Sequence, residues 1–349
     1  MTRHLEWLAE DRPEIERGGL SAARWRWQDL VSYARSNATT PQRLTEERQR
    51  FLIQHALALD PKVDLKTALD DPRKAQGEAR ILEVAGFQEL QAAGLYYPAY
   101  PLDSFPPGSI EVTLRFCLLT PLLTRDDAAF TLFDNPLRKD AIYGVPYLSA
   151  ASVKGLAADA FQRGFPPQAP WETLGANDAE RTTAYRRRTA QAKRLFGVAT
   201  DQEGMPSAEG RVRFDPIWFR YVQYLVMNPM KTDGSGIGTQ PIHFEAAAAK
   251  TPKGDSVSAT VRLLYFNPAG TEASDEATAC ADVAALVEAL AAWWPVLGLG
   301  AKRLAGYGAL RPEGAAYRYR TANSVKQQEF SGDESWQKLA KALAQEGRS

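Results

Sequence analysis

The chain has 349 residues, which is enough for one large domain or two ordinary ones. Hydrophobic residues make up 44% and charged residues 24%, so the composition excludes a disordered chain, a collagen and a coiled coil. Lys plus Arg number 42, and so do Asp plus Glu, so the net charge is zero. This argues against a protein that binds nucleic acid by its overall charge, but it does not exclude a local basic groove.

The sequence shows no pattern typical of a disulfide framework, a zinc site or a membrane-spanning helix. Cys117 and Cys280 are too few for a disulfide scaffold or a cysteine zinc site, and the three histidines form no zinc motif. The longest apolar run is interrupted by Glu288 and Pro295, so none reaches the roughly 18 residues of a membrane helix. The first residues carry acid and lack an apolar signal core. We expect a cytoplasmic protein with reduced thiols and no membrane association.

Residues 1–100 are predicted to form a helical N-terminal region, because Ala, Leu, Glu, Gln and Arg dominate and apolar residues recur at helical spacing. One helix in it is predicted from about Arg73 to Ala93, with Gly94 as its C-terminal stop. Prolines then cluster, and residues 101–108 are predicted to be a Pro-rich linker.

From residue 109 the pattern changes. Residues 109–118 alternate apolar and polar side chains, which predicts a strand with one buried face. The other predicted elements are helices over 150–161 and 282–294 and strands over 210–214, 257–266 and near residue 309. This is the ferredoxin-like order, which also builds RNA-recognition modules. We expect an α+β fold with a ferredoxin-like (RRM-like) βαββαβ core and large insertions over 109–320, then a polar tail over 321–349 with a short helix near 336–344.

The first candidate site is the glycine-rich segment 298–308, GLGAKRLAGYG. Glycines let a backbone turn sharply and approach a phosphate closely, and two cations lie in the middle. A helix precedes the segment and a strand follows it, so neither a dinucleotide-binding fold nor a P-loop fits. Contact with a phosphate backbone and a tight helix-to-strand turn both stay open. The residues that would make the contact are Gly298, Gly300, Lys302, Arg303, Gly306 and Gly308.

The second candidate site is the start of the helix predicted over 150–161. Ser149, Ser152 and Lys154 lie there. Free backbone amides at a helix N-terminus favour an anion. The alternative is an ordinary capped helix with a solvated lysine.

The third candidate site is Phe-Asp-Asn-Pro-Leu-Arg-Lys-Asp, residues 133–140, in the long connection after the first strand. Asp134 could bind a metal or accept a proton in phosphoryl chemistry. Arg138 and Lys139 are candidate RNA contacts beside it. The alternative is an Asp-Asn-Pro turn.

The fourth candidate site is residues 181–194, which hold six basic residues and no acid. This is a local asymmetry in a chain of zero net charge. RNA phosphates at Arg186 and Arg187, an acidic protein partner, or a solvated helix face would each explain it.

Taken together, these segments resemble the RAMP superfamily of type III CRISPR effector complexes. Residues 146–155 are similar to the family's Pro-Gly-Ser-Ser-Leu-Lys-Gly motif, although they lack its Pro-Gly. Residues 195–197 are similar to its Leu-Phe-Gly, and 210–215 to its strand ending in an acidic residue. Residues 298–308 are similar to its C-terminal glycine-rich loop. The resemblance covers about residues 109–313.

The resemblance implies a guide-RNA-binding architectural subunit of a CRISPR ribonucleoprotein, which binds target RNA in antiviral defence beside other RAMP subunits. It implies that the glycine-rich segment and the Lys154 helix contact the guide backbone. The glycines of residues 234–238, which suggest a protruding loop or hairpin, would match the family's thumb. The length, the helical N-terminal region and Met227-Asn228-Pro229 before Pro241-Ile242 are most similar to the sixth, backbone-capping subunit of Cmr-type complexes. That subunit is regarded as noncatalytic and needs no cofactor.

Two alternatives stay open. Asp134 resembles the aspartate of the repeating backbone subunits, which cut target RNA. The chain would then be a metal-assisted endoribonuclease subunit that uses a divalent metal such as Mg²⁺. The other alternative is a protein-interaction subunit that touches no RNA.

Overall fold

The computed structural model describes residues 81–84, 86–124, 137–140, 142–163, 190–198, 208–227, 242–268 and 276–347. The chain divides into two compact units, which we describe separately. The smaller unit comprises Met1–Gln91, Thr124–Pro146 and Arg220–Asp255. The larger unit comprises Ala92–Leu123, Tyr147–Phe219 and Ser256–Ser349.

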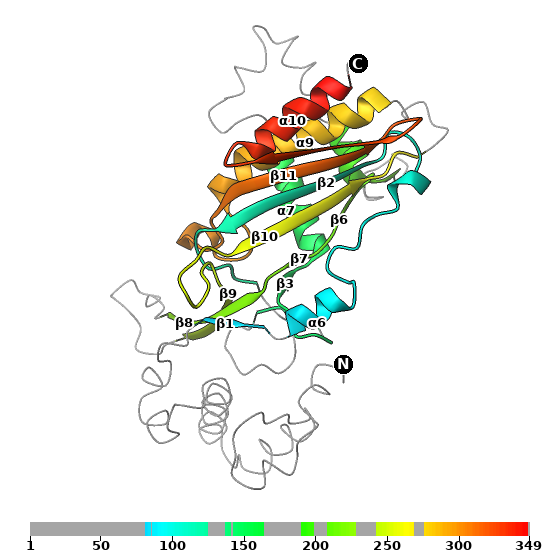
Figure 1. Ribbon diagram of the computed structural model, residues 1–349. Helices are drawn as coiled ribbons and strands as arrows, with labels where there is room; N and C mark the ends of the chain where they lie inside the picture. The colour runs from blue at the N-terminus through cyan, green and yellow to red at the C-terminus, as the bar shows by residue number, and fades with distance from the viewer. Residues whose placement is uncertain are drawn as a thin grey trace, which may run out of the picture. The chain divides into compact units, whose positions relative to one another are not determined.

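The larger unit is built on a five-stranded sheet in which every neighbouring pair is antiparallel (Figure 1). Its strands are β2 (Ile110–Leu118), β6 (Val212–Phe214), β10 (Ser258–Tyr265), β11 (Leu310–Arg320) and β12 (Val325–Ser331). Their spatial order is β12-β11-β2-β10-β6. Helix α7 (Ala150–Gln162) lies between β2 and β6 in the chain, and α9 (Glu276–Leu297) lies between β10 and β11. The fold is therefore α+β.

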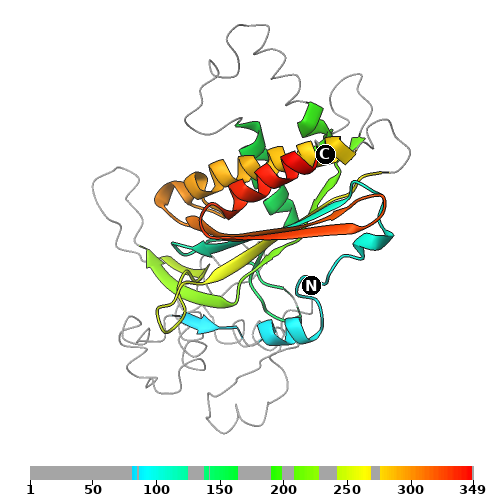
Figure 2. The same cartoon turned by 45° about the horizontal axis from the view of Figure 1, so that its top comes forward.

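Helices α9 and α10 (Ser335–Glu346) lie side by side over one face of this sheet, and α7 packs against α9 (Figures 1 and 2). Trp294 of α9 and Trp336 of α10 are buried, and their ring centroids lie 6.1 Å apart. Helix α9 is longer than predicted, because it begins at Glu276 and continues through Pro295 to Leu297. It is long and apolar enough to cross a membrane, but its packing between the sheet and two helices is that of a core helix.

The alternation that predicted the first strand of the core is confirmed by β2. Ile110, Val112, Leu114 and Phe116 are completely buried, whereas on the other face Arg115 is exposed and Glu111 and Cys117 are buried. Burying such side chains stabilises a fold by about 1.5–3 kcal/mol each, so the period-two pattern fixes which face of the strand meets the helices. Helices α7, α9 and α10 and strands β6, β10 and β11 also confirm the elements predicted in those regions.

Two strands differ from the predictions. Strand β1 (Ile81–Glu83) lies in the stretch predicted to be helical, where only α6 (Gly86–Ala92) is a helix among the described residues. Strand β12 lies in the predicted polar tail, and its largely exposed side chains show no alternation. Strand β1 is held by backbone pairing with β8, which is distant in the sequence, and β12 is held by backbone pairing with β11. The side-chain pattern of β1 and β12 therefore does not reveal them.

The smaller unit holds a three-stranded antiparallel sheet in the order β1-β8-β9. Strands β8 (Tyr221–Met227) and β9 (Ile242–Ala247) pair directly, with Met227 opposite Ile242. This pairing agrees with the hairpin predicted around residues 234–238. The connection itself lies outside the described residues, so its role as a thumb stays a prediction.

Candidate functional site

The glycine-rich segment 298–308 forms a closed turn between α9 and β11. A Cβ atom on Gly308 would lie 1.8 Å from the carbonyl oxygen of Leu299, and one on Gly300 would lie 2.4 Å from that of Leu123. Both glycines also have positive φ angles, 72° and 79° respectively. Glycine is therefore required here by the close approach of backbone segments to one another.

Much of the hydrogen-bonding capacity of this turn is used inside the chain. The amides that donate to backbone carbonyl groups are those of Gly298, Leu299, Ala301, Ala305, Gly306 and Gly308, at distances of 2.7–2.9 Å. These six groups cannot cradle a phosphate without breaking the turn. A ligand at this turn therefore meets mainly side chains.

The side chains that the turn presents are those of Lys302, Arg303 and Leu304. Lys302 adopts a left-handed conformation with φ 54°, and a short 3-10 helix, η4 (Arg303–Ala305), follows it. Lys302 is exposed, Arg303 is partly exposed and Leu304 is completely exposed. Contact of the two cations with RNA stays a prediction, and their placement on the outside of the turn is compatible with it.

The start of α7 is an orthodox capped helix. Ser149 accepts a hydrogen bond from the amide of Ser152 at 3.2 Å, and the two hydroxyl groups lie 2.8 Å apart. Lys154 is partly exposed and makes no hydrogen bond or ion pair with the described residues. The indole of Trp294, near the end of α9, donates to the Leu156 carbonyl of α7 at 3.4 Å. This hydrogen bond connects α7 to the end of α9 that leads into the glycine-rich turn.

Lys139, a predicted RNA contact, pairs with a buried carboxylate in the smaller unit, and its role in RNA binding stays a prediction. Its Nζ lies 2.7 Å from Oε1 of Glu245, whose side chain is 5% exposed. Oε2 of Glu245 accepts from the amide of Leu137 at 3.2 Å. Arg138 is exposed, and its amide donates to the Thr124 hydroxyl at 2.8 Å. Glu245 therefore fixes the chain here, and Lys139 has a structural partner that its sequence position does not reveal.

Three predicted site residues, Asp134, Arg186 and Arg187, lie outside the described residues. The basic segment ends in Arg194, which is described, and its guanidinium makes two hydrogen bonds of 2.7 Å with the completely buried Asp282 of α9. These bonds raise the pKa of Arg194. At least this one of the six basic residues holds the fold together.

The Leu-Phe-Gly segment, which contributes to the family resemblance, also has a structural function. Gly197 has φ 87°, and a Cβ on it would lie 2.6 Å from the Ala208 carbonyl oxygen. A Cβ on Gly210 would lie 2.4 Å from the carbonyl carbon of Phe196. The two glycines thus let β4 (Gly197–Val198) and its partner β5 (Ala208–Glu209) meet backbone to backbone.

A buried cation that the sequence analysis missed holds Pro98 and Tyr100, just before the predicted Pro-rich linker, to the sheet. Arg262 of β10 donates to the carboxylate of Asp215 and to the carbonyl of Pro98, and its guanidinium lies 4.4 Å from the ring centroid of Tyr100. The Tyr100 hydroxyl donates to Asp215 at 2.9 Å, and burial together with this carboxylate raises the pKa of Tyr100 to about 12. Residues 98–100 therefore pack on the sheet face opposite the helices. The only sequence feature that could have indicated this packing is the presence of tyrosines among the prolines.

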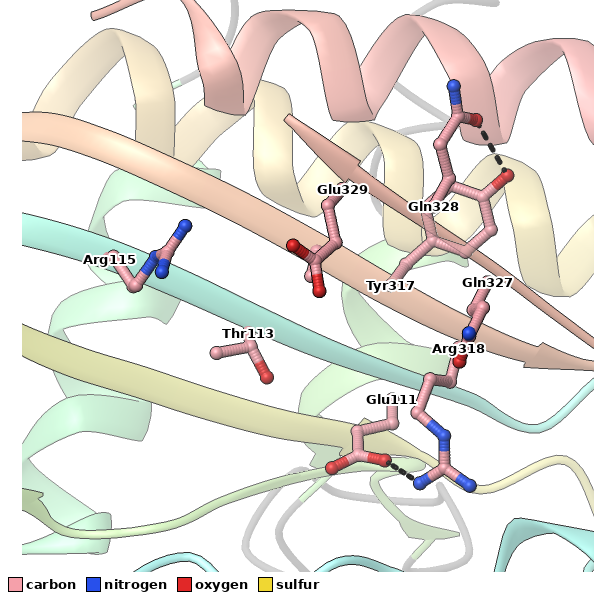
Figure 3. Close-up of a pocket in the computed structure, with 9 residues that line it drawn as sticks. Glu111, Thr113, Arg115, Tyr317, Arg318, Gln327, Gln328 and Glu329 are labelled. Carbon is pink, nitrogen blue, oxygen red and sulfur yellow. Dashed lines mark hydrogen bonds and ion pairs between the residues drawn. The ribbon is translucent and has the colours of Figure 1, made fainter. Parts of the chain in front are cut away.

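The rest of that sheet face is open and polar (Figure 3). A hollow of about 440 Å³ lies over β2, β11 and β12. In it Glu111 accepts from Arg318 at 2.7 Å, and the exposed Arg115 lies over Gly314 of the neighbouring strand. The one aromatic residue that lines the hollow, Tyr317, is buried. An RNA-recognition module stacks bases on exposed aromatic rings of its sheet, so this face is not arranged for that mode of binding.

Among the described residues, no group of three or more His, Cys, Asp or Glu side chains could hold a metal ion. Asp134, the residue on which the metal-assisted alternative depends, is not among them.

Comparison with solved structures finds distant likenesses. A chain of the "Type III-B Cmr-beta bound to cognate target RNA" is 14% identical, covers 92% of this chain and 89% of its own, and has a TM-score of 0.43. A chain of the "Csm3-Csm4 subcomplex in the type III-A CRISPR-Cas interference complex" is 14% identical, covers 68% and 95%, and has a TM-score of 0.37. A chain of a "CRISPR RNA-guided surveillance complex" is 12% identical, covers 62% and 72%, and has a TM-score of 0.39.

A search of curated proteins finds no match to this sequence. The sequence does match the family described as "RAMP superfamily" over residues 115–311, which is more than half of the chain. The matched stretch contains the end of β2, the Lys154 helix, the Leu-Phe-Gly segment and the glycine-rich turn. The chain belongs to the RAMP superfamily.

Proposed function

We propose that this protein is a guide-RNA-binding architectural subunit of a type III CRISPR ribonucleoprotein that binds target RNA in antiviral defence. One observation carries the proposal. The family match over residues 115–311 includes the Lys154 helix and the glycine-rich turn, which the family resemblance assigns to the guide backbone. Its partners are then the guide RNA, the target RNA and other RAMP subunits, and its place is the cytoplasm.

The sheet of the larger unit is, in this proposal, a ferredoxin-like core with β12 added at one edge. The spatial order β11-β2-β10-β6, with all neighbours antiparallel, supports it. So does the position of α7 after β2 and of α9 after β10 in the chain. The core then serves as a scaffold, and the contacts with RNA come from the loops and helix ends around it.

Charge supports a role in holding RNA through its backbone. When the sequence is read by pairing between guide and target, the protein needs only contacts with phosphates and shape. Lys154, Lys302 and Arg303 supply cations at the surface of the larger unit, although the chain carries no net charge. The assignment of this chain as the sixth subunit of a Cmr-type complex stays a prediction, since much of the sequence that suggests it lies outside the described residues.

The proposal is tested by purifying the native complex and sequencing the RNA extracted from it. We expect short RNAs of uniform length that carry a common repeat-derived end. A complex that contains partner proteins but no RNA would refute the proposal.

A second experiment tests the two cations of the glycine-rich turn. The double variant Lys302→Ala/Arg303→Ala should weaken binding of guide RNA and reduce the slope of log K against log salt by about 1.4, since each phosphate contact with a single strand contributes about 0.7. The matched control is Lys338→Ala/Lys341→Ala on the exposed side of α10, which should change neither quantity. Equal slopes for both double variants would exclude these cations from the RNA contact.

A further inference from the structure

Three of the exposed aliphatic side chains of the described residues belong to segments that meet at the glycine-rich turn. Among the described residues, six large apolar side chains are exposed, and Leu304 of this turn is the most exposed, at 108%. Leu119 and Val296, at 53% and 66%, belong to the same group of six. Scattered apolar side chains are ordinary at a protein surface, whereas a cluster indicates a contact with another molecule.

Backbone contacts place the neighbouring segments at the turn. The Leu119 amide donates to the Ala309 carbonyl at 2.8 Å, and the Thr120 hydroxyl donates to the Gly306 carbonyl at 2.7 Å. Val296 lies in the last turn of α9, two residues before the segment begins. The three aliphatic side chains therefore belong to one end of the larger unit.

The turn holds Leu304 in place. The amide of Ala305 donates to the Lys302 carbonyl, and the amide of Gly306 donates to the Arg303 carbonyl, each at 2.9 Å. The backbone that carries Leu304 is therefore fixed before it binds, so little backbone conformational entropy is lost on contact.

The chemistry of the tip fits a nucleotide. Lys302 and Arg303 immediately precede Leu304, and the whole segment 298–308 contains no acidic residue. An anionic ligand that also offers an apolar surface would suit this tip. RNA supplies both, because its phosphates are negative and the faces of its bases are apolar. Leucine is one of the side chains that proteins press between bases.

We propose that Leu304 packs against the face of an unstacked guide base while Lys302 and Arg303 contact the adjoining phosphates. This deepens the guide-binding proposal above and rests on it. The contact is independent of base identity, because every base has an apolar face.

Photocrosslinking in the assembled complex tests the inference. A diazirine analogue of leucine at position 304 should crosslink to the guide RNA. The matched control position is Leu95, another exposed leucine of the larger unit, at 52%, which should give no RNA crosslink. A crosslink from position 304 to a protein subunit, or none at all in a complex that contains guide RNA, would overturn the inference and leave the guide-binding proposal intact. A complex without RNA would overturn both.

A binding measurement adds a second test. Leu304→Ser should weaken the affinity of the reconstituted complex for guide RNA about fivefold and leave the salt slope unchanged, because a base contact releases no counterions. Leu95→Ser should bind like the parent. An affinity equal to that of the parent for Leu304→Ser would contradict the inference.

Discussion

The glycine-rich turn allows a sharp test of why its glycines are there. Replacing Gly306 by Ala introduces a Cβ at φ 85° but into open space, with no atom within 4 Å. The expected loss is the left-handed backbone cost alone, about 1–2 kcal/mol. Replacing Gly308 by Ala at φ 72° adds a clash, because the new Cβ would lie 1.8 Å from the Leu299 carbonyl oxygen.

Relief of that clash requires the two backbone segments to separate, which breaks the hydrogen bond from the Leu299 amide to the Gly308 carbonyl. Leu299 is completely buried, so its unpaired amide adds about 1–3 kcal/mol. Gly308→Ala should therefore lose about 2–5 kcal/mol in all. Thermal unfolding monitored by circular dichroism measures both variants, with a fall in Tm of about 2–4 °C per kcal/mol. Equal melting temperatures for the two variants would refute the assignment of Gly308 to backbone packing.

Three further predictions concern buried ionisable groups. Asp282→Asn should destabilise the fold by about 3 kcal/mol, because it breaks the ion pair with Arg194; a loss under 1 kcal/mol in urea unfolding would contradict this. Lys139→Ala should cost about 1–3 kcal/mol, since the buried Glu245 loses its ion-pair partner; an unchanged Tm with weaker RNA binding would instead make Lys139 an RNA contact. Burial, followed by the charge of Asp282, raises the pKa of Tyr265 to about 12, so its contribution to stability is complete below pH 10 and is lost as the pH rises toward 12. Urea midpoints between pH 9 and 12 should fall less for Tyr265→Phe than for the parent.

The sequence predicted the parts of the fold that have a strong local pattern. The alternation in β2 and the apolar helix α9 are visible because burial selects one face of each element. Strand β12 was missed, since an edge strand with exposed polar side chains is held by backbone pairing that leaves no trace in side-chain pattern. The contacts of Arg262 with Pro98 and Asp215 were missed for a related reason, because both partners are more than 45 positions away in the chain.

Ion pairs within the fold distinguish the cations that are engaged with carboxylates from those that could contact RNA phosphates. Lys139, Arg194 and Arg262 are cations in sequence, but each is paired with a carboxylate in the structure, so none is freely available to phosphate. Lys154 and Arg303 make no side-chain hydrogen bond or ion pair with the described residues. Both belong to the larger unit and to segments that the family match includes. Zero net charge is therefore compatible with RNA binding, because acidic residues neutralise cations within the fold while cations at the Lys154 helix and the glycine-rich turn remain at the surface.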